Sequence, residues 1–385
     1  MEKKNRYPLV NWMDGMNVRR VHQLQTEDHF TNALCEGQSV GLNKHNYGLL
    51  PYHKGSQASG NFDISEQVTG TVEVRLKRCY AVTSGGYLID FDASEENSLI
   101  SSFSLATEEI EIGQDKDQKW DVILMADPFE RIPVGIPDEK EKSPRHPDAL
   151  PKYLLNVLPS GQINVEELGR HYLVIGRLQK RGNRYEVDGN FIPPCTSMSS
   201  HPDLKEYYAK FGQFIDTIER ASKDIIMKVQ NVDKQSPLAV NIDMICKNIM
   251  LYISSVYFLY RNEGQFYSPL RFINVFSVLA HTCFVSLNFM SKIDKEELLK
   301  YFYEWSDVTP GTFETLLSEN TGIIYDHNNI RGLMVTTERF LYLFNDLWIT
   351  LSRLEYIGKH KENIVVAERS KRQGDTSASK WSLID

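Results

Sequence analysis

The stretch SPLAVNIDMICKNIMLYISSVYFLY, residues 236–260, indicates how the second half of this chain folds. Its apolar residues recur at alternating gaps of four and three, which places them on one face of an α-helix. Proline at the first helical position loses no hydrogen bond there, and Ser236 can accept one from an exposed amide. The stretch predicts a long amphipathic helix with the apolar stripe Leu238, Ile242, Ile245, Ile249, Tyr252, Val256 and Leu259.

Two neighbouring stretches follow the same pattern, and each begins at a proline, Pro202 or Pro269. The first has the stripe Leu204, Tyr208, Phe211, Ile215, Ile218, Ser222, Ile225 and Val229, and the other has Ile273, Phe276, Ala280, Cys283, Leu287 and Met290. A repeat of about 3.5 residues favours helices that wind around one another. We therefore expect a helical bundle in the form of a rod, roughly 40 Å long.

Shorter helices are expected after this bundle. One begins at Asp294, one begins at Pro310 behind Thr309, and one covers residues 336–356 and is stopped by Gly358. The polar tail from Ser370 is expected to be flexible.

Residues 60–195 have the period-two alternation of half-buried strands, clearest from Val68 to Leu76. The turn residues Ser84-Gly85-Gly86 and Arg181-Gly182-Asn183 predict two hairpins, and the Pro-rich residues 136–151 predict an exposed loop. The expected fold class is therefore α+β, with an N-terminal all-β sandwich, a long helical bundle and a short mixed C-terminal region.

The bulk composition narrows the class of protein. A length of 385 residues with 41% hydrophobic residues fits two or three globular domains, and a net charge of −8 argues against a nucleic-acid-binding surface. The five cysteines form no C-x-x-C pair, which indicates buried free thiols in a reducing compartment. The first residues contain no signal-peptide apolar run, so an intracellular location is expected.

Residues 238–260 and 269–290 are apolar enough to be considered as membrane spans. The first contains Asp243 and Lys247, and the second contains Arg271. Because a charge at the bilayer centre costs about 2.5–3.5 kcal/mol on insertion scales, two buried helices are the better interpretation.

The sequence contains no motif typical of a catalytic or metal site. It has no glycine-rich phosphate loop, no G-x-S-x-G, no H-E-x-x-H, and no Glu-x-x-His on the heptad helices. His22, His29, His45 and His53 are close in sequence, but their irregular spacing fits no ligand pattern. No cofactor or metal is expected. A cytosolic enzyme that uses these histidines and the loop 136–151 is the weaker alternative.

The stretch VNWMDGMNVRRVHQLQTEDHF, residues 10–30, carries Trp, Met, Arg and His near the start of the chain. Val10 and Trp12 would lie on one face of a short strand, and Asp14-Gly15 would supply a turn. The residues alone favour an N-terminal segment that docks its tryptophan on the β domain.

The same stretch resembles the N-terminal signature of the TssK family, W-x-E-G-M-x-L-R-x-x-H, a family of type VI secretion baseplate subunits. The matching residues are Trp12, Asp14, Gly15, Met16, Val18, Arg19, His22 and Gln25. Further segments resemble the family in the same order: YGLL (47–50), VRLKRCYAVTSGGYLIDFD (74–92), FIPPCTS (191–197), YSPLRFINVFSVLA (267–280) and YEWSDVTPGTF (303–313).

This resemblance implies a non-enzymatic adaptor that forms a homotrimer and lies in the cytoplasm, at the baseplate facing the inner membrane. It implies a β-sandwich shoulder (1–195) that binds the wedge subunits TssF, TssG and TssE, and a helical neck (196–319) that trimerises. A C-terminal region (320–385), shortened relative to the family's head, would reach a membrane-complex protein. The wedge-binding signature would be Trp12, Asp14, Gly15, Met16, Arg19 and His22.

In this interpretation three chains bury their heptad stripes against one another. The expected trimer core is Leu204, Phe211, Ile218, Ile242, Ile249, Val256, Ile273 and Phe276. Each such side chain would contribute about 1.5–3 kcal/mol when fully buried. A phage tail or tailocin baseplate adaptor, similar to a receptor-binding protein in architecture, is the alternative among binding proteins.

Overall fold

The computed structural model describes residues 7–51, 58–67, 71–93, 98–104, 118–161, 168–181, 184–306 and 308–361. Parts of four predicted features lie outside them: the strand start at 68–70, the turn residues 182–183, His53 and the tail from Ser370. The backbone forms two compact units. The first unit, here the β unit, comprises residues 1–205, 265–270 and 326–331, and the second, here the helical unit, comprises residues 206–264, 271–325 and 332–385.

The first sheet of the β unit is built around one long strand, β3 (Thr71–Val82). Four strands pair with it in antiparallel fashion: β1 (Gly48–Leu49), β2 (Gly60–Glu66), β4 (Leu88–Asp92) and β5 (Leu99–Ser104). The amide of Thr83 donates a hydrogen bond of 2.9 Å to the Tyr87 carbonyl, which closes the tight turn between β3 and β4. The hairpin predicted at Ser84-Gly85-Gly86 is confirmed.

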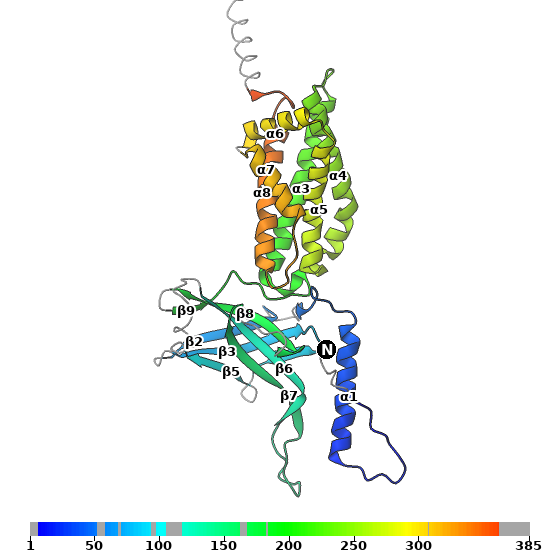
Figure 1. The fold of residues 1–385 in the computed structure, drawn as a ribbon, viewed down its shortest axis with the longest axis vertical. Helices are drawn as coiled ribbons and strands as arrows, with labels where there is room; N and C mark the ends of the chain where they lie inside the picture. Colours follow the sequence, from blue (N-terminus) through cyan, green and yellow to red (C-terminus); the bar gives the residue numbers. More distant parts are fainter. Residues whose placement is uncertain are drawn as a thin grey trace, which may run out of the picture. The chain divides into compact units, whose positions relative to one another are not determined.

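The second sheet has the strand order β7-β6-β8-β9, and all its pairs are antiparallel (Figure 1). Its strands are β6 (Lys119–Val134), β7 (Asp148–Pro159), β8 (Tyr172–Arg181) and β9 (Arg184–Val187). Arg181 is paired with Arg184, which confirms the predicted hairpin there. The connection between β6 and β7 is mostly exposed, as predicted for the Pro-rich loop.

The two sheets pack against each other through aromatic side chains. The rings of Phe91 and Tyr153 lie 5.6 Å apart, and those of Phe103 and Tyr185 lie 6.2 Å apart. Gly176 on β8 faces the ring of Phe62 on β2 so closely that any Cβ atom at position 176 would overlap that ring. Glycine is therefore required where these two strands approach each other.

An N-terminal helix precedes the strands, so the expectation of an all-β N-terminal domain is corrected. Residues 7–19 form no strand, and α1 (Arg20–Ser39) follows them. Only Cys35 of this helix is buried. The apolar residues Val21, Phe30 and Leu34 do not share one face, and for that reason hydrophobic periodicity could not reveal the helix.

The helical unit is built mainly from α3 (Pro202–Gln230), α4 (Pro237–Glu263), α5 (Pro269–Asn288), α6 (Lys292–Ser306), α7 (Pro310–Thr321) and α8 (Ile330–Arg353). Short 3₁₀ turns precede α3 (Met198–Ser200) and follow α4 (Gly264–Phe266). The three predicted proline starts are confirmed. Ser236 accepts a hydrogen bond from the Ala239 amide, and Thr309 accepts one from Thr312, as capping predicts. α6 begins two residues before the predicted Asp294.

Helices α3, α4, α5 and α8 run side by side along the unit (Figure 1). Tyr208 on α3 and Tyr260 on α4 each donate a hydroxyl to the other's carbonyl, at 3.3 and 2.7 Å. Lys228 on α3 donates to the Ser352 and Leu354 carbonyls at the end of α8. α8 begins six residues before the predicted start at 336.

The observed fold confirms the α+β class, with a β region of two sheets followed by helices. The homotrimer and the three domain boundaries remain predictions.

Candidate interaction surfaces

The predicted signature residues gather around the start of α1. Asp14-Gly15 forms the predicted turn, with a φ of 78° at Gly15. The Arg19 amide donates a hydrogen bond of 3.2 Å to Nδ1 of His22, and the rings of His22 and Trp12 lie 6.1 Å apart, edge to face. Trp12 is 49% exposed, and its ring packs on His22 of the same segment. Docking of Trp12 on the β domain, which the residues alone favoured, stays a prediction.

Apolar side chains of this segment face solvent in unusual number. The strongly exposed ones are Leu9, Trp12, Met13, Val18, Val21, Phe30 and Leu34. The helix is held by a few contacts: Arg131 binds Asp28 at 2.8 Å, and Tyr7 stacks on Phe129 with ring centres 4.2 Å apart. Exposed apolar residues on a lightly attached helix are typical of a surface that binds another protein.

The structure buries most of the predicted trimer core inside a single chain. Seven of the eight side chains are at most 2% exposed: Leu204, Phe211, Ile218, Ile242, Ile249, Ile273 and Phe276. The eighth, Val256, is half-buried. Phe211 packs on the rings of Phe272 and Phe276 at 5.5 and 5.0 Å. Packing between helices of one chain is sufficient to explain their apolar character.

A second stripe with a seven-residue repeat lies on the exposed side of α4. It consists of Met244, Leu251 and Phe258, of which Leu251 is 70% and Phe258 is 73% exposed. The neighbouring helix α5 adds exposed Val278 and Phe284. The sequence does carry this second heptad frame, but the stronger stripe masked it.

Helices Pro237–Phe266 and Pro269–Asn288 are long and apolar enough to cross a membrane by length and composition alone. The most apolar part of α5 is 50% buried within the protein, whereas that of α4 is 28% buried.

Three segments that are distant in sequence meet in the β unit. Leu49 lies between β3 and residues 194–196, since its amide donates to the Pro194 carbonyl at 2.8 Å and its carbonyl accepts from Thr196 at 2.9 Å. His327, which is 3% exposed, donates from Nε2 to the Tyr47 carbonyl at 2.8 Å. Burial lowers the pKa of His327, and this keeps the ring neutral at pH 7.

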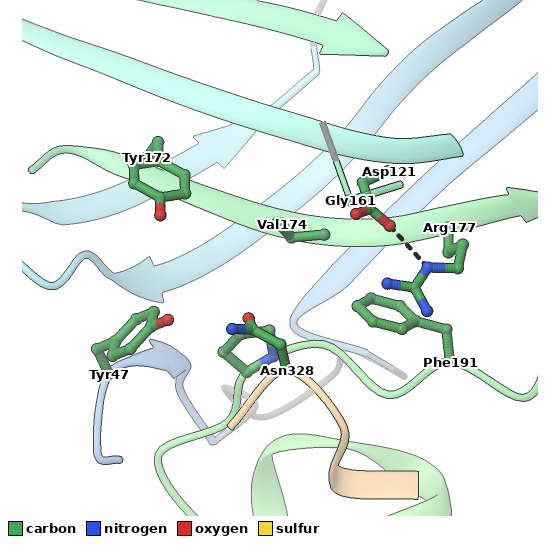
Figure 2. A pocket seen from close by; sticks show the side chains of 9 residues that line it. Tyr47, Asp121, Gly161, Tyr172, Val174, Arg177, Phe191 and Asn328 are labelled. Atoms are coloured by element: carbon green, nitrogen blue, oxygen red, sulfur yellow. Dashed lines mark hydrogen bonds and ion pairs between the residues drawn. The ribbon is translucent and has the colours of Figure 1, made fainter. Parts of the chain in front are cut away.

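A cavity of about 260 Å³ lies at this meeting point (Figure 2). Its walls come from six segments of the β unit, with the lining residues Tyr47, Asp121, Gly161, Tyr172, Val174, Arg177, Phe191, Pro194 and Asn328. Arg177 is fixed by Asp121, to which its Nε donates at 2.6 Å, and by the ring of Phe191, 4.3 Å from its guanidinium carbon. Tyr47, Phe191 and Pro194 lie in segments that resemble the TssK family. Asp121, Arg177 and Asn328 belong to no local motif in the sequence.

The described cysteine and histidine side chains do not form a metal or nucleophile cluster. No group of three or more His, Cys, Asp or Glu side chains in this part of the chain could hold a metal ion. All five cysteines are buried and unpaired, and burial raises the pKa of Cys79 to about 12, far from the reactive thiolate range. His22, His29 and His45 do not converge on one site: the Nδ1 atom of His29 lies 2.6 Å from the Tyr7 carbonyl, and His22 binds the Arg19 amide.

The fold belongs to the α+β class, with two packed sheets followed by a bundle of long helices. Solved structures of TssK and of a type VI secretion baseplate complex are similar to this fold. A baseplate complex matches 89% of this chain and 99% of its own at a TM-score of 0.54 and 14% identity. A crystal structure of TssK matches 89% of this chain and 70% of its own, at a TM-score of 0.51 and 14% identity. TssK of the EAEC system, bound to nanobody nb18, matches 86% of this chain and 99% of its own. Its TM-score is 0.50 and its sequence identity is 17%.

The resemblance to TssK is therefore confirmed at the level of the fold. A scan against known protein families gives no match, and a search of curated proteins gives none either.

Proposed function

We propose that this chain is a structural, non-enzymatic adaptor of a type VI secretion baseplate, assembled on the cytoplasmic side of the inner membrane. The observation that carries the proposal is the fold match, which extends over both the β region and the helices. The residue pattern around Trp12 supports it independently, because those residues lie together on one exposed segment. In a solved baseplate subcomplex, TssK is found with TssF and TssG.

The wedge-binding surface is proposed to be the N-terminal segment with α1. Trp12 and Met13 are large and exposed, and Trp is enriched among residues that dominate binding energy. TssF- and TssG-like subunits would cover this segment. The test is co-purification of the full chain with candidate TssF- and TssG-like wedge subunits. Trp12→Ala is expected to weaken that binding more than tenfold, as expected for a residue at the centre of an interface.

Trimerisation is proposed to use the exposed α4 stripe, while the predicted core positions keep the helices that carry it folded. Because Ile249 is fully buried in one chain, Ile249→Asp is expected to unfold the helical unit. Leu251→Asp is the matched variant, two residues away and 70% exposed. It is expected to dissociate the trimer while circular dichroism stays unchanged. Light scattering that reports an intact trimer for Leu251→Asp would rule out the α4 stripe.

Membrane-complex binding is proposed for the C-terminal region. Removing residues 320–385 would delete α8, whose residues Phe344 and Trp348 are buried in the helical unit, so that deletion cannot separate binding from folding. A chain that ends at residue 361 keeps α8. It is expected to bind the wedge normally and to lose the membrane-complex protein. Retention of both partners would show that residues 362–385 are not needed.

A further inference from the structure

The cavity beside Tyr47 presents hydrogen-bond donors from three separate segments toward one space. Figure 2 shows the Tyr47 and Tyr172 hydroxyls, the Asn328 amide and the Arg177 guanidinium around this space. Burial raises the pKa of Tyr47 to about 12 and also raises that of Tyr172, so both phenols remain protonated donors at pH 7. Asp121 is the carboxylate of the lining, and its Oδ1 already accepts from Ser160 and from Arg177.

Arg177 is held in a position that leaves one edge of its guanidinium available. Its Nε edge is engaged by Asp121, the residue directly opposite on β6. Stacking on Phe191 fixes the plane of the guanidinium. Within the described residues, no side chain or carbonyl accepts a hydrogen bond from its Nη atoms. A planar guanidinium with a free edge binds a carboxylate through two parallel hydrogen bonds.

We propose that this cavity binds a carboxylate on a short apolar stem, with the carboxylate at the Nη edge of Arg177. Tyr172 and Asn328 donate further hydrogen bonds, and the stem lies against Val174, Phe191 and Pro194.

Two sources supply this chemistry: a free small dicarboxylic acid, or a glutamate side chain of a partner protein. The probes are glutarate and N-acetyl-glutamate-N-methylamide, and the neutral control is N-acetyl-glutamine-N-methylamide. Binding to the full chain is measured by calorimetry and by ligand-observed NMR. The acid is expected to bind at least about tenfold more tightly than the amide of the same shape, since only the acid makes charge-assisted hydrogen bonds. Tighter binding of glutarate identifies the free acid as the ligand, and tighter binding of the blocked glutamate identifies a partner's side chain.

Variants test the position of the ligand. Arg177→Lys keeps a positive charge beside Asp121 but removes the planar guanidinium group. Tyr172→Phe removes one hydroxyl without changing the ring. Each is expected to weaken binding of the acid by roughly three- to tenfold. Tyr342→Phe, on an exposed position of α8, is the matched control and is expected to change nothing. Equal binding of acid and amide, no binding of either acid, or an unchanged affinity in Tyr172→Phe would overturn the proposal.

Discussion

The indole nitrogen of Trp348 donates a hydrogen bond of 2.9 Å to the hydroxyl of Ser222 in the middle of the helical unit. Trp348 lies on α8 and is 1% exposed, and Ser222 lies on α3 and is completely buried. Ser222 is the polar residue in the otherwise apolar stripe of α3, and its partner is 126 residues away. This bond therefore explains a break in the heptad pattern and ties α8 to the first long helix.

We expect Ser222→Ala to destabilise the protein by about 1–3 kcal/mol, because it leaves a buried indole N–H without its acceptor. The measurement is the free energy of unfolding from urea denaturation. Ser254→Ala, on the exposed side of α4, is the control and is expected to change this free energy little. A Ser222→Ala protein as stable as the parent would mean that the bond contributes nothing.

Gly176→Ala is expected to destabilise the β unit by about 1–3 kcal/mol, because the added methyl group overlaps the ring of Phe62. Phe62→Leu in the same chain creates space beside position 176. The double variant is therefore expected to be more stable than the sum of the two single effects predicts. Additive single effects, measured by denaturation, would show that the two residues do not compete for space.

Gly86→Ala is expected to release α1 and leave both sheets folded. Gly86 has a φ of 83°, and a Cβ atom there would overlap the Cys35 carbonyl, at the one buried residue of α1. Faster amide hydrogen exchange limited to residues 20–39 would report the release. Gly37→Ala is the control: nothing lies within 4 Å of its added Cβ, so the helix is expected to gain about 1 kcal/mol in stability. Slow exchange in Gly86→Ala would contradict the proposed anchor.

Stability is expected to fall as the pH drops from about 7.5 to 5. The pKa of His327 is lowered, mainly by burial, and burial also lowers those of His171 and His201. Above the unfolded-state pKa of about 6.5, both states are neutral and these groups contribute nothing. Below it the unfolded chain takes up protons that the folded chain does not, which favours unfolding.

His327→Gln is the variant that isolates one of these groups. Its amide can still donate to the Tyr47 carbonyl, but it does not titrate. The decrease in melting temperature from about pH 7.5 to pH 5 is expected to be smaller in His327→Gln than in the parent protein. His281→Gln, in the helical unit, is the control substitution. A pH profile identical to that of the parent would show that His327 does not contribute.

Local chemistry was sufficient to predict most of the elements. Proline at positions 202, 237, 269 and 310 fixed the helix starts, because a residue without an amide hydrogen loses nothing in the first turn. The turn around Gly85 predicted a hairpin because a short glycine-rich connection between two strands favours a tight turn. The N-terminal signature around Trp12 was also visible in the sequence, although its exposure on a lightly held segment was not.

What the buried stripes face was decided only by the tertiary structure. A heptad of apolar residues is satisfied equally well by another helix of the same chain or by a second copy, because burial has no direction. The chain supplies its own partner, since α8 brings Phe344 and Trp348 into the same unit as α3. The cavity needed tertiary structure for a related reason: Tyr47, Arg177 and Asn328 are far apart in sequence, and only folding of the β unit places their donors around one space.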